Sequence, residues 1–81
     1  MTHELKLEYA FQDAVLSGEK SFEVRLNDRG FQKGDKVKFH VINRQNVVEP
    51  LDEKTYIITY VLSGWGIQDG YVVFGIREVE L

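Results

Sequence analysis

The sequence of 81 residues contains no cysteine, a single proline and no long hydrophobic run. Without cysteine the chain forms neither disulfides nor thiolate metal sites, and this composition fits a reducing cytoplasm. No apolar stretch approaches the roughly 20 residues that a membrane-spanning helix needs, and no N-terminal segment has the apolar region of a signal peptide. Proline-rich tracts, repeats and low-complexity segments are absent too. We therefore expect one soluble, cytoplasmic domain over residues 1–81, without membrane contact.

Acidic residues outnumber basic ones by 13 to 10, and the net charge is −3. This balance disfavours non-specific binding to nucleic acid, which requires many Lys and Arg side chains to neutralise phosphates, and no feature signals DNA binding. A pocket for one nucleotide needs only local charge and stays possible. His3 and His40 have no His or Cys partner nearby in the sequence, so we expect no metal and no cofactor.

The N-terminal part of the chain combines a predicted strand with a predicted helix. Residues 3–7 alternate, with Leu5 and Leu7 on one face, which indicates an opening strand. Over residues 9–17 apolar side chains recur three and four positions apart, as in a helix with one apolar stripe. The stripe contains Ala10, Phe11, Ala14 and Val15. Gly18 follows at the position where a left-handed residue ends a helix.

Further strands are predicted in the rest of the chain. Residues 36–43 alternate between polar and apolar side chains, as a half-buried antiparallel strand does. Residues 54–62 are rich in β-branched and aromatic side chains, which is typical of a central strand or one covered on both faces. Residues 71–79 alternate again, and Gly75 within them indicates a bulge or a bend. The connecting segments 26–35, 44–53 and 64–70 are predicted loops.

One helix near the start, followed by strands without intervening helices, predicts an α+β domain. Its mostly antiparallel sheet is expected to curl into a small β-barrel. Closure of the barrel would protect sheet edges that a chain of this length cannot otherwise cover.

Charged side chains are arranged, rather than scattered, at the entry of the strand after the helix. Residues 18–25 have the sequence Gly-Glu-Lys-Ser-Phe-Glu-Val-Arg. Because successive side chains of a strand face opposite sides, Phe22 and Val24 are predicted to enter the core. Glu23 and Arg25 are then expected to stand together on a polar surface or cleft.

The spacing Gly18-x-Lys20-x-x-Glu23-x-Arg25 resembles the signature of the ASCH domain, a branch of the PUA-like β-barrels. The similarity extends to the loop 27–29, the turn 33–35 and the segment 69–76, which together resemble a small bacterial and phage subgroup of unknown function. This resemblance implies a PUA-like barrel with one N-terminal helix, and a cleft beside that helix suited to RNA or a nucleotide-like ligand. A shared scaffold does not assign an activity, which depends on the site itself.

The resemblance implies that a ligand lies against the motif side chains. The candidate ligand-binding residues are Lys20, Glu23, Arg25, Asn27, Arg29 and Trp65. Arg25 can present a planar fork to a phosphate or carboxylate, and the alternative is an ion pair with Glu23 that orients the strand. In a regular strand Lys20 points away from Glu23, unless the corner after the helix turns it toward the cleft. Trp65 and Tyr71 could stack on a nucleobase, although packing in the core or at the barrel rim is favoured for both.

A second branch of the superfamily implies a different function. Its members are compact amidohydrolases that remove acyl groups from acetylated cytidine, with the motif lysine and a threonine at the position of Glu23. A carboxylate replaces that hydroxyl here, so binding is favoured over catalysis. If the chain is an enzyme, Lys20 and Glu23 are the candidate catalytic pair, with Ser21 as an alternative nucleophile and Glu8 or Asp69 as a second carboxylate. A protein-binding regulatory adaptor is the third alternative, and the oligomeric state stays open.

Overall fold

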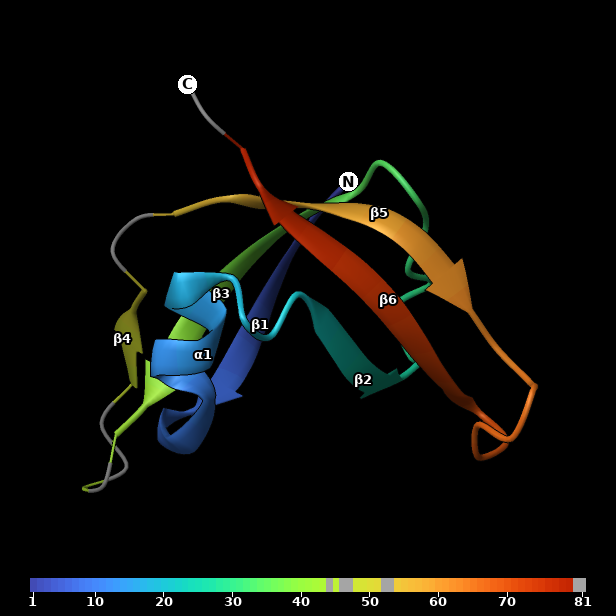
Figure 1. The fold of residues 1–81 in the computed structure, drawn as a ribbon, viewed down its shortest axis with the longest axis horizontal. Helices are drawn as coiled ribbons and strands as arrows, with labels where there is room; N and C mark the ends of the chain where they lie inside the picture. The colour runs from blue at the N-terminus through green and yellow to red at the C-terminus, as the bar shows by residue number, and fades with distance from the viewer. Residues whose placement is uncertain (44, 46–47, 52–53, 80–81) are drawn as a thin grey trace.

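The structure is a computed structural model that describes residues 1–43, 45, 48–51 and 54–79. Its elements are β1 (Thr2–Glu8), the 3-10 helix η1 (Tyr9–Phe11), α1 (Gln12–Ser17), β2 (Phe22–Leu26), β3 (Lys36–Ile42), β4 (Val48–Pro50), β5 (Tyr56–Leu62) and β6 (Tyr71–Glu78). The predicted α+β class is confirmed, with a curled sheet and one short helix (Figure 1). No helix among the described residues has the length and apolarity to cross a bilayer.

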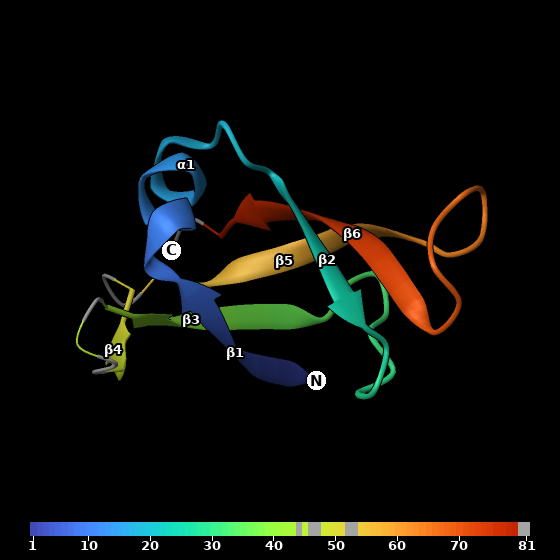
Figure 2. The ribbon, with the colours of Figure 1, turned by 90° about the horizontal axis from the view of Figure 1, so that it is seen from below.

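The described strands form one sheet in the order β1-β3-β5-β6-β2, and β4 pairs with β3 outside this path. β1 runs parallel to β3, whereas β2, β4 and β5 form antiparallel pairs with their neighbours. The sheet curls so that α1 lies at one end and the loop after β5 lies at the other (Figure 2). β1 and β2 are the two ends of the path, and a seam separates them.

The hydrophobic core lies inside the curl, and in β1, β3 and β6 it follows the predicted alternation. Its largest fully buried side chains are Phe39, Phe74, Leu7, Ile58 and Val37. The register shifts between Ile58 and Tyr60, opposite Gly75, so the irregularity predicted at Gly75 is present, but the extra residue lies in β5 and not in β6. A Cβ atom on Gly75 would lie 2.5 Å from Thr59 Oγ1, so the glycine gives room to the irregular strand.

The helical segment is less regular than predicted. Residues 9–11 form a 3-10 turn, and the α-helix covers only residues 12–17. Gly18 ends it in the left-handed conformation, with φ of 81°. Val15 is buried, but Phe11 of the same predicted stripe is half exposed. Because α1 covers one end of the sheet and not its face, a helix of six residues is enough to bring Val15 to the core.

The predicted connection over residues 44–53 contains the short strand β4, which pairs with β3, and the buried side chain of Leu51. The rest of that prediction, at residues 44, 46–47 and 52–53, lies outside the described residues. β5 is central in the sheet, as predicted, but it is not covered on both faces, because Tyr60 is largely exposed.

Trp65 lies in the loop between β5 and β6, and its side chain is 91% exposed. The expectation that it packs in the core or at the rim is therefore wrong. Trp65 has φ of 55° between Gly64 and Gly66, which have φ of 71° and 88°. This left-handed run turns the loop outward, at the end of the molecule opposite α1 (Figure 1).

Candidate functional site

The motif strand β2 presents the opposite face to the interior from the one predicted. Phe22 and Val24 are 46% and 53% exposed, whereas Glu23 is only 3% exposed. The prediction that Phe22 and Val24 enter the core is therefore wrong. β2 ends the sheet, so its inner face meets the seam with β1, where cations rather than apolar side chains surround the Glu23 carboxylate.

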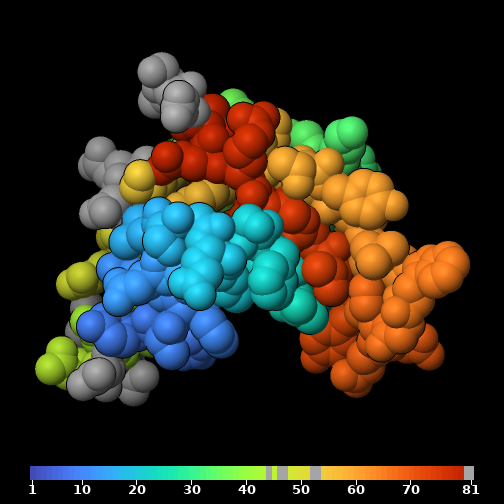
Figure 3. Space-filling model, in the orientation of Figure 1, coloured from blue at the N-terminus to red at the C-terminus, as the bar shows by residue number. Residues whose placement is uncertain are grey.

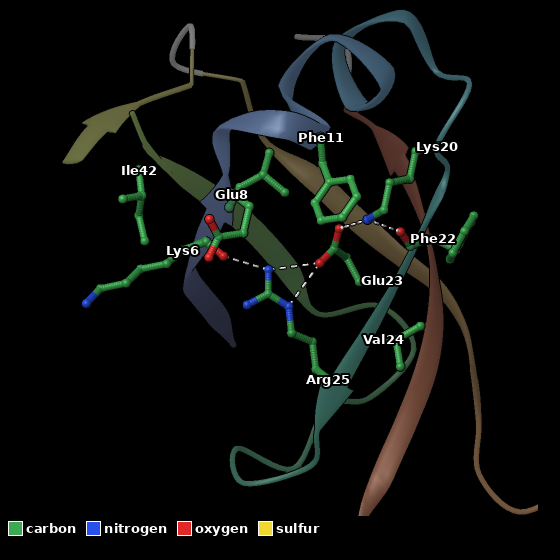
Figure 4. Close-up of a pocket in the computed structure, with 10 residues that line it drawn as sticks. Lys6, Glu8, Phe11, Lys20, Phe22, Glu23, Val24, Arg25 and Ile42 are labelled. Carbon is green, nitrogen blue, oxygen red and sulfur yellow. Dashed lines mark hydrogen bonds and ion pairs between the residues drawn. The ribbon is translucent and has the colours of Figure 1, made fainter. Parts of the chain in front are cut away.

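Glu23 is held between two cations. Lys20 Nζ donates to Glu23 Oε1 at 2.5 Å, and Arg25 Nε donates to Oε2 at 2.9 Å. Arg25 Nη2 lies 2.8 Å from the same Oε2 atom. A buried carboxylate is costly unless charged partners of this kind surround it. The three motif side chains therefore form one cluster, in which they point toward one another (Figure 4).

Lys20 precedes β2 and lies at the corner after the helix. Its main-chain N–H donates to Ala14 O at 2.9 Å, which ties the corner to α1. Its Nζ atom also donates to Phe22 O at 3.0 Å. The rings of Phe11 and Phe22 have their centroids 5.0 and 5.3 Å from Nζ, within the range of cation–π attraction. The corner thus turns Lys20 toward Glu23, away from the position that a regular strand would give it.

The cluster lies in an open cleft of about 690 Å³ between β2, β1 and the helical segment. The residues that line it are Lys6, Leu7, Glu8, Phe11, Lys20, Phe22, Glu23, Val24, Arg25 and Ile42. This volume is in the range of about 300–1,000 Å³ that small-molecule sites occupy. Three cations and two carboxylates stand among these lining residues, so the cleft carries a small positive excess inside an acidic chain.

A second cleft of about 490 Å³ continues along the seam. It shares Lys6, Val24 and Arg25 with the first, and Arg29 and Tyr71 also line it. Two arginines bridge the seam by donating to main-chain carbonyls of β1. Arg25 Nη2 donates to Lys6 O at 2.8 Å, and Arg29 Nη1 donates to Glu4 O at 3.0 Å.

Several candidate residues lie elsewhere. The two clefts along the seam are not lined by Asn27, Trp65, Ser21 or Asp69. Asn27 Oδ1 accepts a hydrogen bond from the main-chain N–H of Phe31 at 3.0 Å, so its side chain holds the loop after β2. Glu8, by contrast, lines the first cleft. Of the two suggested second carboxylates, Glu8 is the one near Lys20 and Glu23.

Lys6, Phe11 and Ile42 also line the first cleft, and none was a candidate from the sequence. Lys6 was detectable as a polar side chain alternating with Leu5 and Leu7, but its proximity to β2 depends on the strand order. Phe11 was assigned to the apolar stripe of the helix. Within the described part of the chain, no group of three His, Asp or Glu side chains is arranged to hold a metal ion.

A second buried polar pair lies away from the cleft. His3 is buried, and its Nε2 atom is 2.8 Å from Asp35 Oδ2, which also accepts from the main-chain N–H of Gln32 at 3.1 Å. The hydrogen bond with His3 is the main cause that holds the pKa of the Asp35 carboxyl below its ordinary value of 3.8. The pair ties the start of β1 to the turn before β3.

Comparison with known proteins gives one family. The family model described as "Domain of unknown function (DUF3850)" matches residues 2–76 of the chain. A search of curated proteins finds no match. The matched range includes both edge strands and every residue that lines the first cleft.

Proposed function

For this chain, which belongs to the family described as "Domain of unknown function (DUF3850)", we propose a module that binds RNA or a modified nucleotide in the first cleft. One observation carries the proposal: Lys20, Glu23 and Arg25 converge on one open cleft beside the helical segment (Figure 4). The ASCH-like spacing of these residues supports the same class of ligand. We also propose a PUA-like barrel as the finer description of the curled sheet.

Arg25 is the proposed phosphate-binding residue. Its Nε and Nη2 atoms are held by Glu23 and by Lys6 O, and among the described residues its Nη1 atom has no partner. A guanidinium already held in one orientation loses little side-chain entropy when an anion binds. The remaining donor is therefore available to one phosphate oxygen at a low entropic cost.

The aromatic wall of the cleft supports a nucleobase as the other part of the ligand. Phe11 and Phe22 are both close to half exposed, and they stand on either side of Lys20 Nζ. Stacking of a base on an aromatic ring contributes about 1–3 kcal/mol. An apolar wall with a cation at its centre suits a nucleotide better than it suits a sugar or an inorganic anion alone.

The small positive charge of the cleft limits how many phosphate groups of a ligand it can bind. The positive excess of its lining residues is small, and the whole chain carries −3. We therefore propose recognition of a single nucleotide, free or within an RNA, and not of a long phosphate backbone. The logarithm of affinity should fall with the logarithm of salt concentration with a slope near −0.7, the value of about one phosphate contact on a single strand.

Calorimetric titration with cytidine monophosphate and a short single-stranded RNA tests the proposal. Arg25→Ala is expected to weaken binding at least tenfold, whereas Lys33→Ala, which removes the same charge in a turn outside the clefts, should leave it unchanged. Phe11→Leu keeps the apolar volume without an aromatic face and should also weaken binding. Equal affinities for Arg25→Ala and Lys33→Ala, or no binding by the unmodified chain, would contradict it.

An amidohydrolase that acts on acylated nucleosides, such as acetylated cytidine, is the second candidate. Two observations favour it: Lys20 and Glu23 line the same cleft, and Lys20 Nζ lies 2.5 Å from Glu23 Oε1, so one bound substrate would be within reach of both an acid and a base. Binding ranks first because each Glu23 oxygen is already held by a cation. If the unmodified chain hydrolyses N4-acetylcytidine, and if Lys20→Ala and Glu23→Gln each abolish this activity, catalysis would rank above binding. The adaptor alternative ranks below both, since it required an apolar patch without a cleft.

A further inference from the structure

The two clefts along the seam meet at one group of residues. Lys6, Val24 and Arg25 line both of them, so the clefts adjoin where β1 passes β2. The side chains of β2, in teal, border a hollow in the outline of the molecule, and the helical segment, in blue, stands on its other side (Figure 3). Each cleft is large enough for a small molecule, at about 690 and 490 Å³. A ligand that crosses the boundary at Arg25 can therefore occupy both.

Positive charge in the clefts is concentrated at their boundary. Lys6 and Arg25 are the charged residues that both clefts share, and both are cations. Apart from these two, each cleft has two carboxylates and only one cation among its lining residues. The guanidinium nitrogen of Arg25 that carries no dashed line in Figure 4 points away from Glu23. A phosphate group therefore fits best at the boundary, with the uncharged parts of the ligand on either side.

The second cleft has an aromatic wall of its own. Tyr71 on β6 stands opposite Leu26 on β2, and both residues line this cleft. The Tyr71 side chain is partly exposed, so its ring is accessible to a ligand. Glu4 and Asp28 add carboxylates, which can accept hydrogen bonds from the hydroxyl or amino groups of a nucleoside. The second cleft thus offers a nucleoside the same two features as the first, an aromatic ring and hydrogen-bond acceptors.

We propose that the second cleft binds the neighbouring nucleoside of a single RNA strand, and that the phosphodiester joining the two nucleosides lies at Arg25. This inference rests on the proposed function and narrows it, since the bound nucleotide then lies within a strand and is not free. Each internucleotide phosphate carries one negative charge, which matches the single phosphate contact proposed for the first cleft. A free nucleotide would leave the aromatic wall of the second cleft unused.

The distance between the two aromatic walls favours a single strand. Phe22 and Leu26 lie four residues apart on β2, and Tyr71 is opposite Leu26. Since a strand rises about 3.3 Å per residue, the two walls are about 13 Å apart. Neighbouring bases of a duplex are about 3.4 Å apart along the helix axis, so they cannot reach both walls. Unpaired bases can be splayed apart and stacked on separate aromatic side chains.

Calorimetric titration with matched ligands tests the second subsite. The dinucleotide cytidylyl-cytidine supplies both nucleosides, whereas the methyl phosphate esters of cytidine, at its 3′ or 5′ position, supply the same phosphodiester charge with one nucleoside. The dinucleotide should bind at least about fivefold tighter than either ester, which is the lower end of the gain from one stacked base. Tyr71→Leu should remove this gain and leave the affinity for the esters unchanged. Tyr60→Leu, at an exposed tyrosine of β5 that lines neither cleft, should alter neither affinity.

The outcomes separate this inference from the proposed function. If the esters bind and Arg25→Ala weakens them, but the dinucleotide binds no tighter or Tyr71→Leu keeps the gain, the second subsite is overturned and the first cleft stands. No binding of any of these ligands would overturn both. If circular dichroism shows that Tyr71→Leu is unfolded, chemical-shift mapping of the unmodified chain decides. The dinucleotide should then shift the amides of residues 26–29 and of Tyr71 more than the esters do, and equal shifts would overturn the subsite.

Discussion

The two edge strands of the sheet, β1 and β2, differ in how their outward main chain is satisfied. On β1, the carbonyls of Glu4 and Lys6 accept hydrogen bonds from the side chains of Arg29 and Arg25. On β2, the outward N–H groups, including that of Val24, have no partner among the described residues. The chain thus closes one edge with its own arginines and leaves the other open. The two edges face each other across the seam, so the outward main chain of β2 lies beside the clefts that both strands line.

β1 is also held by side-chain contacts from both of its faces. His3 contacts Asp35 in the turn before β3, and His40 Nε2 of β3 lies 2.9 Å from Glu4 Oε1. β2 is tied to the rest of the chain by its ladder with β6 and by the Glu23 cluster. Substitutions that remove these contacts should therefore show how much each edge strand contributes to stability.

The largest effect is expected from Glu23→Ala, which leaves Lys20 and Arg25 beside each other without their anion. Breaking a buried ion pair costs about 3–5 kcal/mol, and we expect about 2–3 kcal/mol because both cations keep some contact with water. Urea denaturation measures this loss in the free energy of unfolding. Glu49→Ala, at an exposed position of β4, is the matched control and should change stability by less than about 0.5 kcal/mol. Equal stabilities of the two variants would show that the cluster does not hold β2.

A smaller, pH-dependent effect is expected from Asp35→Ala, which releases the start of β1. At neutral pH the loss should be about 2 kcal/mol, since hydrogen bonds to a charged group contribute about 1.5–3 kcal/mol. The hydrogen bond with His3 lowers the pKa of Asp35 from its ordinary 3.8. The stabilisation is therefore complete above pH 3.8 and disappears as the pH falls through the lower, folded-state pKa.

Thermal melts of the unmodified chain and of Asp35→Ala, recorded over a series of pH values, measure this dependence. The gap between the two melting temperatures should close on acidification. Asp69→Ala, in the loop after β5, should show no gap at any pH. A gap that stays constant through the acid range would contradict the role of the ionised Asp35.

The smallest effect is expected from Arg29→Ala, which uncovers one carbonyl of β1. Because Arg29 is half exposed, the loss should be about 0.5 kcal/mol, and water replaces the lost hydrogen bond to Glu4 O. Hydrogen exchange of the β1 amides and urea denaturation measure it, with Lys33→Ala as the control of equal charge. A loss above about 2 kcal/mol would mean that the seam, and not the core, holds β1 in place.

Alternation along the chain was enough to predict most of the strands. Residues 36–43 and 71–79 bury the side chains expected from their pattern, because those strands lie over the core. The same rule failed for β2, whose inner face meets the seam. A sequence pattern shows that two faces differ, but the strand order decides which of them is buried. That order depends on contacts between distant segments, and alternation does not encode it.

The candidate site was predictable only in part, because its residues come from one strand and from segments that are distant in the sequence. Glu23 and Arg25 were identified together because they share one face of a short strand. Phe11 and Lys6 were missed because their proximity to β2 arises only when β1 and the helical segment close over the seam. Trp65 was misjudged because an isolated aromatic residue is usually packed, whereas three consecutive left-handed residues turn this one into solvent.

Chemical-shift mapping with cytidine monophosphate tests the function of the cleft most directly. The labelled chain should show saturable shifts of the amides of residues 20–25 and of Phe11, with no change in the loop 64–70. The same titration of Arg25→Ala should give much smaller shifts at equal ligand concentration. Shifts that do not saturate, or that gather around Trp65 and leave residues 20–25 unchanged, would contradict nucleotide binding in the cleft.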